Sequence, residues 1–186
     1  MTCIVGLVHD GVVYMGGDSA GVTGYDIATR ADEKVFTNGD FIMGFTTSFR
    51  MGQILRYSFD PPEQSVKKDD MKYLVTDFID NVRNAFSDAG FLSKDDGVEE
   101  GGTFLFGYKG SLYQVDSDFQ IGRPLDKFAA IGCGGQIAMG AMYASKNNPD
   151  PITRITQALE AAEAFSAGVR RPFIVLKFTP EEEDVE

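Results

Sequence analysis

The sequence predicts an α+β fold in which antiparallel sheets are layered with helices. Hairpin signals dominate the first 45 residues, where short apolar runs rich in β-branched side chains flank turn-forming residues. A helical stripe follows, and then strands resume before two further helices and a last strand. Hairpin-linked strands that alternate with pairs of helices are typical of two sheets lying between helical layers.

Four short strands are expected first. Residues 2–8 and 12–15 form one hairpin around the turn at His9-Asp10-Gly11. After a polar stretch, residues 34–36 and 41–45 form a second hairpin around Asn38-Gly39, which favours the positive φ angles of a tight turn.

Two helices should follow. The first spans residues 49–59 and is stopped by Pro61-Pro62. The second has apolar residues at the spacing that buries one helical face, namely Met71, Leu74, Val75, Phe78, Ile79, Val82 and Phe86.

In the second half of the chain, strands are again followed by two helices. The polar stretch 93–102 is expected to be a loop, residues 103–108 and 111–115 a hairpin around Lys109-Gly110, and residues 127–131 one more strand. Residues 135–145 favour a helix, and Asp150-Pro151 is a start signal for another that ends near residue 168. Residues 172–178 supply the last strand.

Composition excludes several classes of protein. The chain has 186 residues, 17 of them basic and 28 acidic, and a formal net charge of −11. We expect one domain over residues 2–179 and an acidic tail over 180–186. Nucleic acids and anionic membranes call for a basic surface, so neither is an expected partner. Without an export signal or an apolar run of about 20 residues, we expect a cytoplasmic protein with free thiols.

The chemical inventory argues against familiar sites. With one histidine and two cysteines, no His-rich or Cys-based metal site can be assembled within one chain. A site made of carboxylates alone stays open but has no motif, and we expect no metal ion. The segment Gly17-Asp18-Ser19-Ala20-Gly21 matches the nucleophile elbow, but the partner histidine should follow the serine, and His9 precedes it. The segment Gly132-Cys133-Gly134-Gly135 lacks the third glycine of a dinucleotide-binding loop.

An N-terminal threonine offers a different chemistry. Methionine aminopeptidases remove Met1 before a residue as small as Thr2, which exposes a hydroxyl nucleophile and an α-amine on one residue. The reference pKa of an α-amine, about 7.7 to 8.0, lets it act as a base near neutral pH. A nearby cation held by a carboxylate would favour deprotonation, and Lys34 and Asp18 could provide this pair. The alternative is an edge-strand residue beside a surface ion pair.

The sequence here resembles the proteasome β-subunit family, and especially the bacterial proteasome-like peptidase of the heat-shock locus. The resemblance covers nearly the whole chain. It implies an αββα sandwich of antiparallel sheets, the N-terminal-nucleophile hydrolase fold. The matching segments are Thr2-Cys3-Ile4-Val5-Gly6, Gly16-Gly17-Asp18-Ser19, Lys34-Val35 and Ala130-Ile131-Gly132-Cys133-Gly134-Gly135.

The resemblance also implies roles for individual residues. Thr2 would be nucleophile and base, Lys34 would tune its pKa, and Asp18 would orient Lys34. Gly44 lies where the family has a glycine whose backbone amide polarises the scissile carbonyl. No cofactor is implied. Phe45, Thr46, Thr47 and Phe49 could line the pocket beside the nucleophile, and a core role for both phenylalanines is equally compatible with the sequence.

Two positions depart from the family pattern. Cys133 stands where a serine hydrogen-bonds near the α-amine, and a thiol is a weaker donor and acceptor. The family's Asp-x-x-Ser near the last helix has no Asp here, where residues 164–168 read Ala-Phe-Ser-Ala-Gly. Ser166 could substitute, although a hydroxyl near a helix end also has a structural explanation.

The function that this resemblance implies is a threonine-type endopeptidase. It would act on protein or peptide substrates inside a self-compartmentalising homo-oligomeric ring or spiral, with an ATPase as a possible partner. Two alternatives share the fold: a catalytically inactive shell or assembly protein, and a small-molecule amidase.

Overall fold

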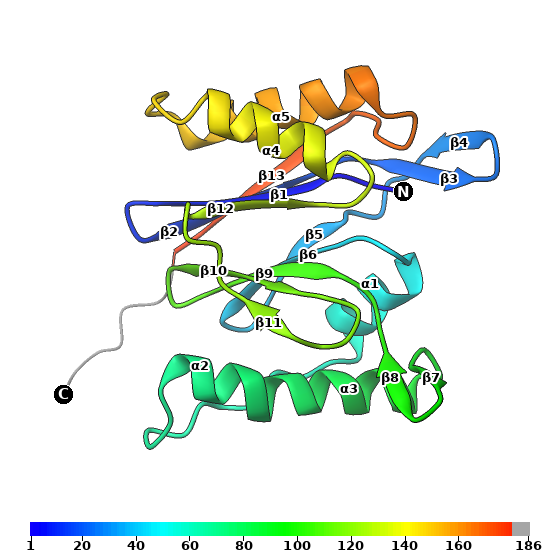
Figure 1. Cartoon of the computed structure of the whole chain (residues 1–186), viewed down its shortest axis with the longest axis vertical. Coiled ribbons are helices and arrows are strands. Elements are labelled where there is room, and N and C mark those ends of the chain that lie inside the picture. Colours follow the sequence, from blue (N-terminus) through cyan, green and yellow to red (C-terminus); the bar gives the residue numbers. More distant parts are fainter. Residues whose placement is uncertain (180–186) are drawn as a thin grey trace.

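Two antiparallel sheets lie face to face in a computed structural model that describes residues 1–179 (Figure 1). The predicted acidic tail, residues 180–186, lies outside the described residues. The strand order of the first sheet is β12 (Phe128–Ile131), β1 (Ile4–His9), β2 (Val12–Gly17) and β13 (Ile174–Phe178). The order of the second is β11 (Ile121–Gly122), β10 (Ser111–Val115), β9 (Phe104–Tyr108), β6 (Phe41–Phe45) and β5 (Val35–Asn38).

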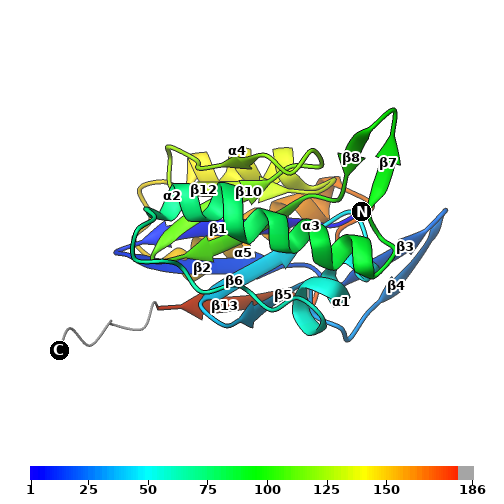
Figure 2. The same cartoon turned by 90° about the horizontal axis from the view of Figure 1, so that it is seen from below.

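Helices cover the outer face of each sheet. The first sheet is covered by α4 (Gly135–Ala144) and α5 (Pro151–Phe165). The second is covered by α1 (Phe49–Tyr57) and by a longer helical segment formed by α2 (Asp70–Tyr73), η1 (Leu74–Phe78) and α3 (Ile79–Asp88) (Figures 1 and 2). The expected four-layer αββα sandwich is therefore confirmed.

Apolar side chains fill the three spaces between the layers. The inter-sheet space holds Ile4, Val13 and Met15 from the first sheet, and Ile42 and Leu105 from the second, all fully buried. Successive residues at the start of β1 face opposite sides of the first sheet. Ile4 points between the sheets, while Cys3 and Val5 pack under α4 and α5. Three buried layers of this kind hold both sheets in a fixed position relative to each other.

The long helical segment corrects the predicted stripe in part. Leu74, Phe78, Val82 and Phe86 are buried as expected, but Met71 is 41% exposed and Val75 43% exposed. The reason is the π-helical turn η1. A π turn adds a residue to the helical repeat and so rotates the face that packs on the sheet.

Two small hairpins lie outside the main sheets. Within the polar stretch before Lys34, β3 (Ala20–Thr23) pairs only with β4 (Asp26–Thr29). The prediction of a loop at 93–102 is wrong, because β7 (Ser93–Asp95) pairs with β8 (Val98–Glu100) around Asp96-Gly97. Both residues of that turn have positive φ, and an Asp-Gly pair is a hairpin signal even between polar strands.

The start of α5 confirms the predicted cap. The Asp150 carboxylate accepts hydrogen bonds from the backbone N–H groups of Ile152 and Thr153, and Pro151 occupies the first helical position. The helix ends at Phe165, slightly before the expected position. In the part of the chain that the structure describes, no helix is long and apolar enough to cross a membrane.

Candidate active site

A buried ion pair connects the two sheets at one end of the sandwich. Asp18 directly follows β2 and Lys34 directly precedes β5. The Lys34 Nζ lies 2.8 Å from the Asp18 Oδ1, and both side chains are fully buried. The alternative of a surface ion pair is therefore wrong, because this pair has no contact with solvent.

Backbone donors surround the carboxylate of Asp18. Its Oδ1 accepts the N–H of Cys3 at 2.9 Å as well as the Lys34 ammonium, while its Oδ2 accepts the N–H groups of Ala20 at 2.9 Å and Arg170 at 3.2 Å. These four donors hold the Asp18 carboxylate in one position between the two sheets. The bond to Cys3 also fixes the peptide that follows Thr2 against the ion pair.

Burial changes the acid–base chemistry of Lys34. Removal of the ammonium from water lowers the pKa of Lys34 below that of a free lysine, and the charge of Asp18 and the hydrogen bond to it offset part of this effect. A positive charge in this position would favour deprotonation of a hydroxyl or amine close to it.

A glycine-rich turn holds Thr2 from the other side. The Thr2 N–H donates to the Cys133 Sγ at 3.3 Å, and the Gly134 N–H donates to the Thr2 carbonyl oxygen at 3.3 Å. Gly132 has φ +91°, and a Cβ built on it would lie 2.2 Å from that same oxygen. Only glycine fits there, so the motif seen in the sequence has a steric reason.

Ser166 completes the group around the Thr2 nitrogen. As the C-cap of α5 it has the structural position considered from the sequence, and its Oγ also donates to the Cys133 Sγ at 3.4 Å. The structure thus brings Thr2, Cys133 and Ser166 into one chain of polar contacts. Met1 is present and 54% exposed, whereas Thr2 is 4% exposed.

Gly44 does not reach this site. It lies inside β6, paired with Val35 on one side and Leu105 on the other. Since β6 is flanked on both sides, its backbone N–H groups point to neighbouring strands. A Cβ on Gly44 would lie 2.6 Å from a methyl of Ile4 and 2.7 Å from the sulfur of Met15, so glycine is required here for inter-sheet packing.

A hollow of about 340 Å³ opens beside Thr2. Phe45, Thr46, Thr47 and Phe49 line it as expected, and Val22 and Ser48 join them. Phe45 also belongs to the buried core, so both readings of this residue are correct. Thr47 has φ +66°, a strained conformation for a β-branched residue. In the part of the chain described, the N–H of Thr47 has no hydrogen-bond acceptor.

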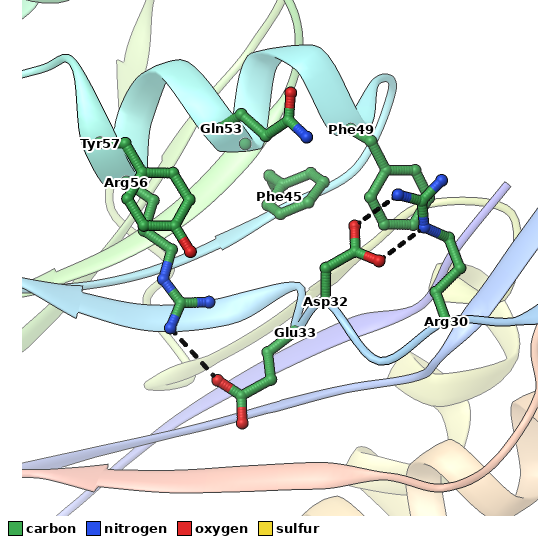
Figure 3. Close-up of a pocket in the computed structure, with 9 residues that line it drawn as sticks. Arg30, Asp32, Glu33, Phe45, Phe49, Gln53, Arg56 and Tyr57 are labelled. Atoms are coloured by element: carbon green, nitrogen blue, oxygen red, sulfur yellow. Dashed lines mark hydrogen bonds and ion pairs between the residues drawn. The ribbon is translucent and has the colours of Figure 1, made fainter.

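A second cavity of about 500 Å³ lies next to this hollow and shares Phe45 and Phe49 with it (Figure 3). Two ion pairs line it. Arg30 binds both oxygens of Asp32 at 2.7 Å and stacks on the Phe49 ring, and Arg56 lies 3.5 Å from Glu33. The lining is therefore polar but close to neutral.

Sequence reasoning missed the backbone N–H of Arg170, which binds Asp18, and the residues Val22 and Ser48, which line the hollow. No side-chain pattern marks a backbone donor, so no sequence signal could have found the first. Among residues 1–179, no group of three or more His, Cys, Asp or Glu side chains could hold a metal ion.

Comparison with known proteins identifies the fold. No family model matches the sequence, and no curated protein matches it. The solved structure of Thiobacillus denitrificans BPH in complex with epoxomicin is 20% identical, with a TM-score of 0.80 over 97% of this chain and 100% of that chain. HslV from Trypanosoma brucei is 17% identical, with a TM-score of 0.67 over 95% and 98% of the two chains.

A third relative extends the group. Anbu (ancestral beta-subunit) from Yersinia bercovieri is 14% identical, with a TM-score of 0.66 over 96% of this chain and 82% of that chain. These structural neighbours are proteasome-like proteins. The chain therefore has the proteasome-like fold that the sequence resemblance implies.

Proposed function

We propose that this protein is a threonine-type peptidase of a proteasome-like homo-oligomer, with Thr2 as its nucleophile after removal of Met1. The observation that carries the proposal is the buried Lys34–Asp18 pair, which is hydrogen-bonded to the peptide directly after Thr2. A fully buried ion pair is costly to maintain, and its position beside a potential nucleophile gives it a chemical use.

The reaction follows from the contacts around Thr2. The α-amine would accept the proton of the Thr2 hydroxyl, and the hydroxyl oxygen would attack a substrate amide carbonyl. The same amine would then protonate the leaving amine, and water would hydrolyse the ester between Thr2 and the acyl group. Lys34 supports the charge on the attacking oxygen, and Cys133 and Ser166 hold the α-amine in place.

The oxyanion donor is reassigned from Gly44 to Thr47. The Thr47 amide has no acceptor among the described residues, and Thr47 lines the hollow beside Thr2 in a strained backbone conformation. A free backbone N–H at such a position is suited to stabilise negative charge on a carbonyl oxygen. Substrate side chains would enter the neighbouring cavity in Figure 3.

The test is the intact mass of the purified protein with and without epoxomicin, the ligand of the BPH structure. Its epoxyketone forms a ring with a free α-amine and the adjacent hydroxyl. We expect a species without Met1 that gains one epoxomicin mass, and we expect Thr2→Ala to lose Met1 but gain nothing.

Two results would contradict the proposal. A protein that retains Met1 has no free nucleophile. A protein that loses Met1 but forms no adduct with epoxomicin or with epoxyketones of other peptide sequences would favour a catalytically inactive shell protein. The absence of the family's Asp and the thiol of Cys133 beside the amine are the features that favour this second candidate.

The assembly and its setting belong to the same proposal. A peptidase site of this kind is confined by a ring or spiral of copies in the cytoplasm, and an ATPase partner would feed it unfolded substrate. Support comes from the fold, since BPH, HslV and Anbu share it.

A further inference from the structure

The loop that connects α5 to β13 supplies polar groups to both sides of the Thr2 site, and it lies at the same end of the sandwich as the N-terminus (Figure 1). At its start, the Ser166 Oγ donates to the Cys133 Sγ at 3.4 Å, and the same sulfur accepts the Thr2 N–H. Near its end, the Arg170 N–H donates to the Asp18 Oδ2 at 3.2 Å. The loop therefore joins the contacts of the Thr2 nitrogen to the buried ion pair.

The middle and the end of this loop pack closely on the site. A Cβ built on Gly168 would lie 2.6 Å from the Cys133 Sγ, so the middle of the loop covers one side of the sulfur. The Arg170 carbonyl oxygen accepts the Ser19 N–H at 2.8 Å, which attaches the end of the loop to the residue after Asp18. A shift of the loop would therefore move polar groups on both sides of the site.

One carboxylate on α5 holds the loop. The Glu163 Oε1 accepts the backbone N–H of Arg171 at 2.8 Å, and its Oε2 accepts the Arg171 Nε, also at 2.8 Å. The Arg171 backbone N–H, and then its guanidinium, lower the pKa of Glu163, so this carboxylate is charged at neutral pH. Charge-assisted hydrogen bonds to both oxygens fix the geometry of the contact as well as its charge.

A second glutamate on the same helix provides a comparison. Glu160 lies 3.8 Å from the Arg171 guanidinium and is 49% exposed, whereas the Glu163 side chain is 20% exposed. An exposed ion pair of the first kind contributes little. The contact of Glu163 with the loop backbone is different, because it does not depend on the conformation of the long Arg171 side chain.

We propose that Glu163 is a positioning residue for the Thr2 site and acts through Arg171. The pair fixes the two ends of the loop relative to each other, with Ser166 beside the Thr2 nitrogen and the Arg170 N–H on the buried carboxylate. Glu163 acts on the loop and not on a reacting atom. This role rests on the proposed peptidase function, but the position of the loop can be measured without turnover.

The rate at which a chromogenic disulfide modifies Cys133 tests the position of the loop. Glu163→Ala removes both contacts with Arg171, so the loop should open more often and the rate should rise by about threefold or more. Glu163→Gln keeps an oxygen that can accept the backbone N–H and should restore most of the native rate. Glu160→Ala, with the same charge change one turn earlier on α5, should leave the rate unchanged. Arg171→Gln keeps the backbone contact, should give an intermediate rate, and replaces Glu163→Ala if that variant does not fold.

Peptide hydrolysis tests the connection to the site. In Glu163→Ala, kcat should fall by about tenfold with KM nearly unchanged, because a displaced group beside the nucleophile affects the reaction more than substrate binding. The loss should be smaller when Ser166 is already replaced by alanine, since Glu163 acts in part through that hydroxyl.

Two results would overturn the proposal. One is a Glu163→Ala protein of normal thermal stability in which Cys133 reacts at the native rate, and the other is an equal change in Glu160→Ala. If the Cys133 rate responds as expected in a protein that hydrolyses no peptide, the positioning of the loop is supported and the peptidase function fails.

Discussion

At the scale of single residues, the pair formed by Lys34 and Asp18 differs from an ordinary surface ion pair because neither side chain contacts water. A buried pair contributes little net stability, whereas the loss of one partner leaves an uncompensated charge in the interior. The resemblance to the proteasome β-subunit family implied their partnership, but not their burial.

Lys34→Ala tests the role of this pair. Peptidase turnover should fall by roughly a hundredfold or more, the scale of a lost acid–base contribution. The free energy of unfolding should fall by about 3 kcal/mol, because Asp18 keeps only its three backbone donors. Peptide hydrolysis and chemical denaturation measure the two effects. Lys177→Ala on β13 is the exposed control, and undiminished turnover in Lys34→Ala would reject the assigned role.

The two cysteines should differ sharply in reactivity. Burial, with a smaller contribution from the charge of Asp18, raises the pKa of Cys3 from 9.0 to about 12, while Cys133 is exposed. A chromogenic disulfide at pH 8 should therefore modify one thiol in the native protein and two in denaturant. Cys133→Ser should remove the native reaction.

The same shift predicts the effect of alkali on stability. The fold favours the protonated thiol of Cys3, so this thiol contributes to the stability of the folded protein. The contribution is complete below pH 9 and is lost as pH rises towards about 12. Denaturant titrations from pH 8 to 11 should show a smaller decline in Cys3→Ala than in the native sequence. Two thiols of equal native reactivity would contradict both expectations.

At the scale of elements, some features follow from a local sequence pattern, and others are visible only in the folded chain. The hairpin of β5 and β6 and the Asp150 cap follow from their own residues, and both are present. The turn itself is shifted by one residue from the prediction, because Asn38 pairs with Phe41 and the loop is Gly39-Asp40, with only Gly39 at positive φ. The π turn η1 has no local signal. In the helix that contains this turn, Met71 and Val75 are exposed, against the simple periodic prediction.

Substitution by alanine at two glycines should change the stability of the protein in opposite directions. Gly132→Ala adds a methyl group at a positive φ and against the Thr2 carbonyl, so it should cost about 3 kcal/mol or more and disturb the site. Gly140→Ala on α4 has open space around its Cβ and should stabilise the protein by about 0.5 to 1 kcal/mol. Thermal unfolding measures both. A Gly132→Ala protein as stable as the native one would show that the cradle around Thr2 is not built as described.

At the scale of the whole molecule, the two ends of the sandwich carry different chemical groups. The Thr2 end carries the buried ion pair and the glycine-rich turn. At the other end, a hollow beside the β1–β2 and β9–β10 turns is lined by Arg123 and Lys127. Both depend on residues that are distant in sequence and that meet only because two sheets are stacked.

The size of the particle tests the proposed assembly. Native mass spectrometry or light scattering should show a particle many times the 20.3 kDa protomer. A strict monomer at micromolar concentration would contradict a compartment, although the fold and the site geometry would stand.

The sequence alone predicted the strands and helices of the two main layers, apart from the short β11, together with the cap of α5 and the glycine-rich turn, but not the hairpins β3–β4 and β7–β8. These features depend on periodicity and turn residues, which are local properties. The candidates Thr2, Asp18 and Lys34 came from the chemistry of an N-terminal threonine and from the family resemblance. The tertiary structure was needed to show that the ion pair is buried, that Gly44 is required for packing between the sheets, and that the backbone amide of Arg170 binds Asp18. Backbone donors and burial cannot be predicted from the sequence, because they arise where strands and loops that are distant in sequence meet.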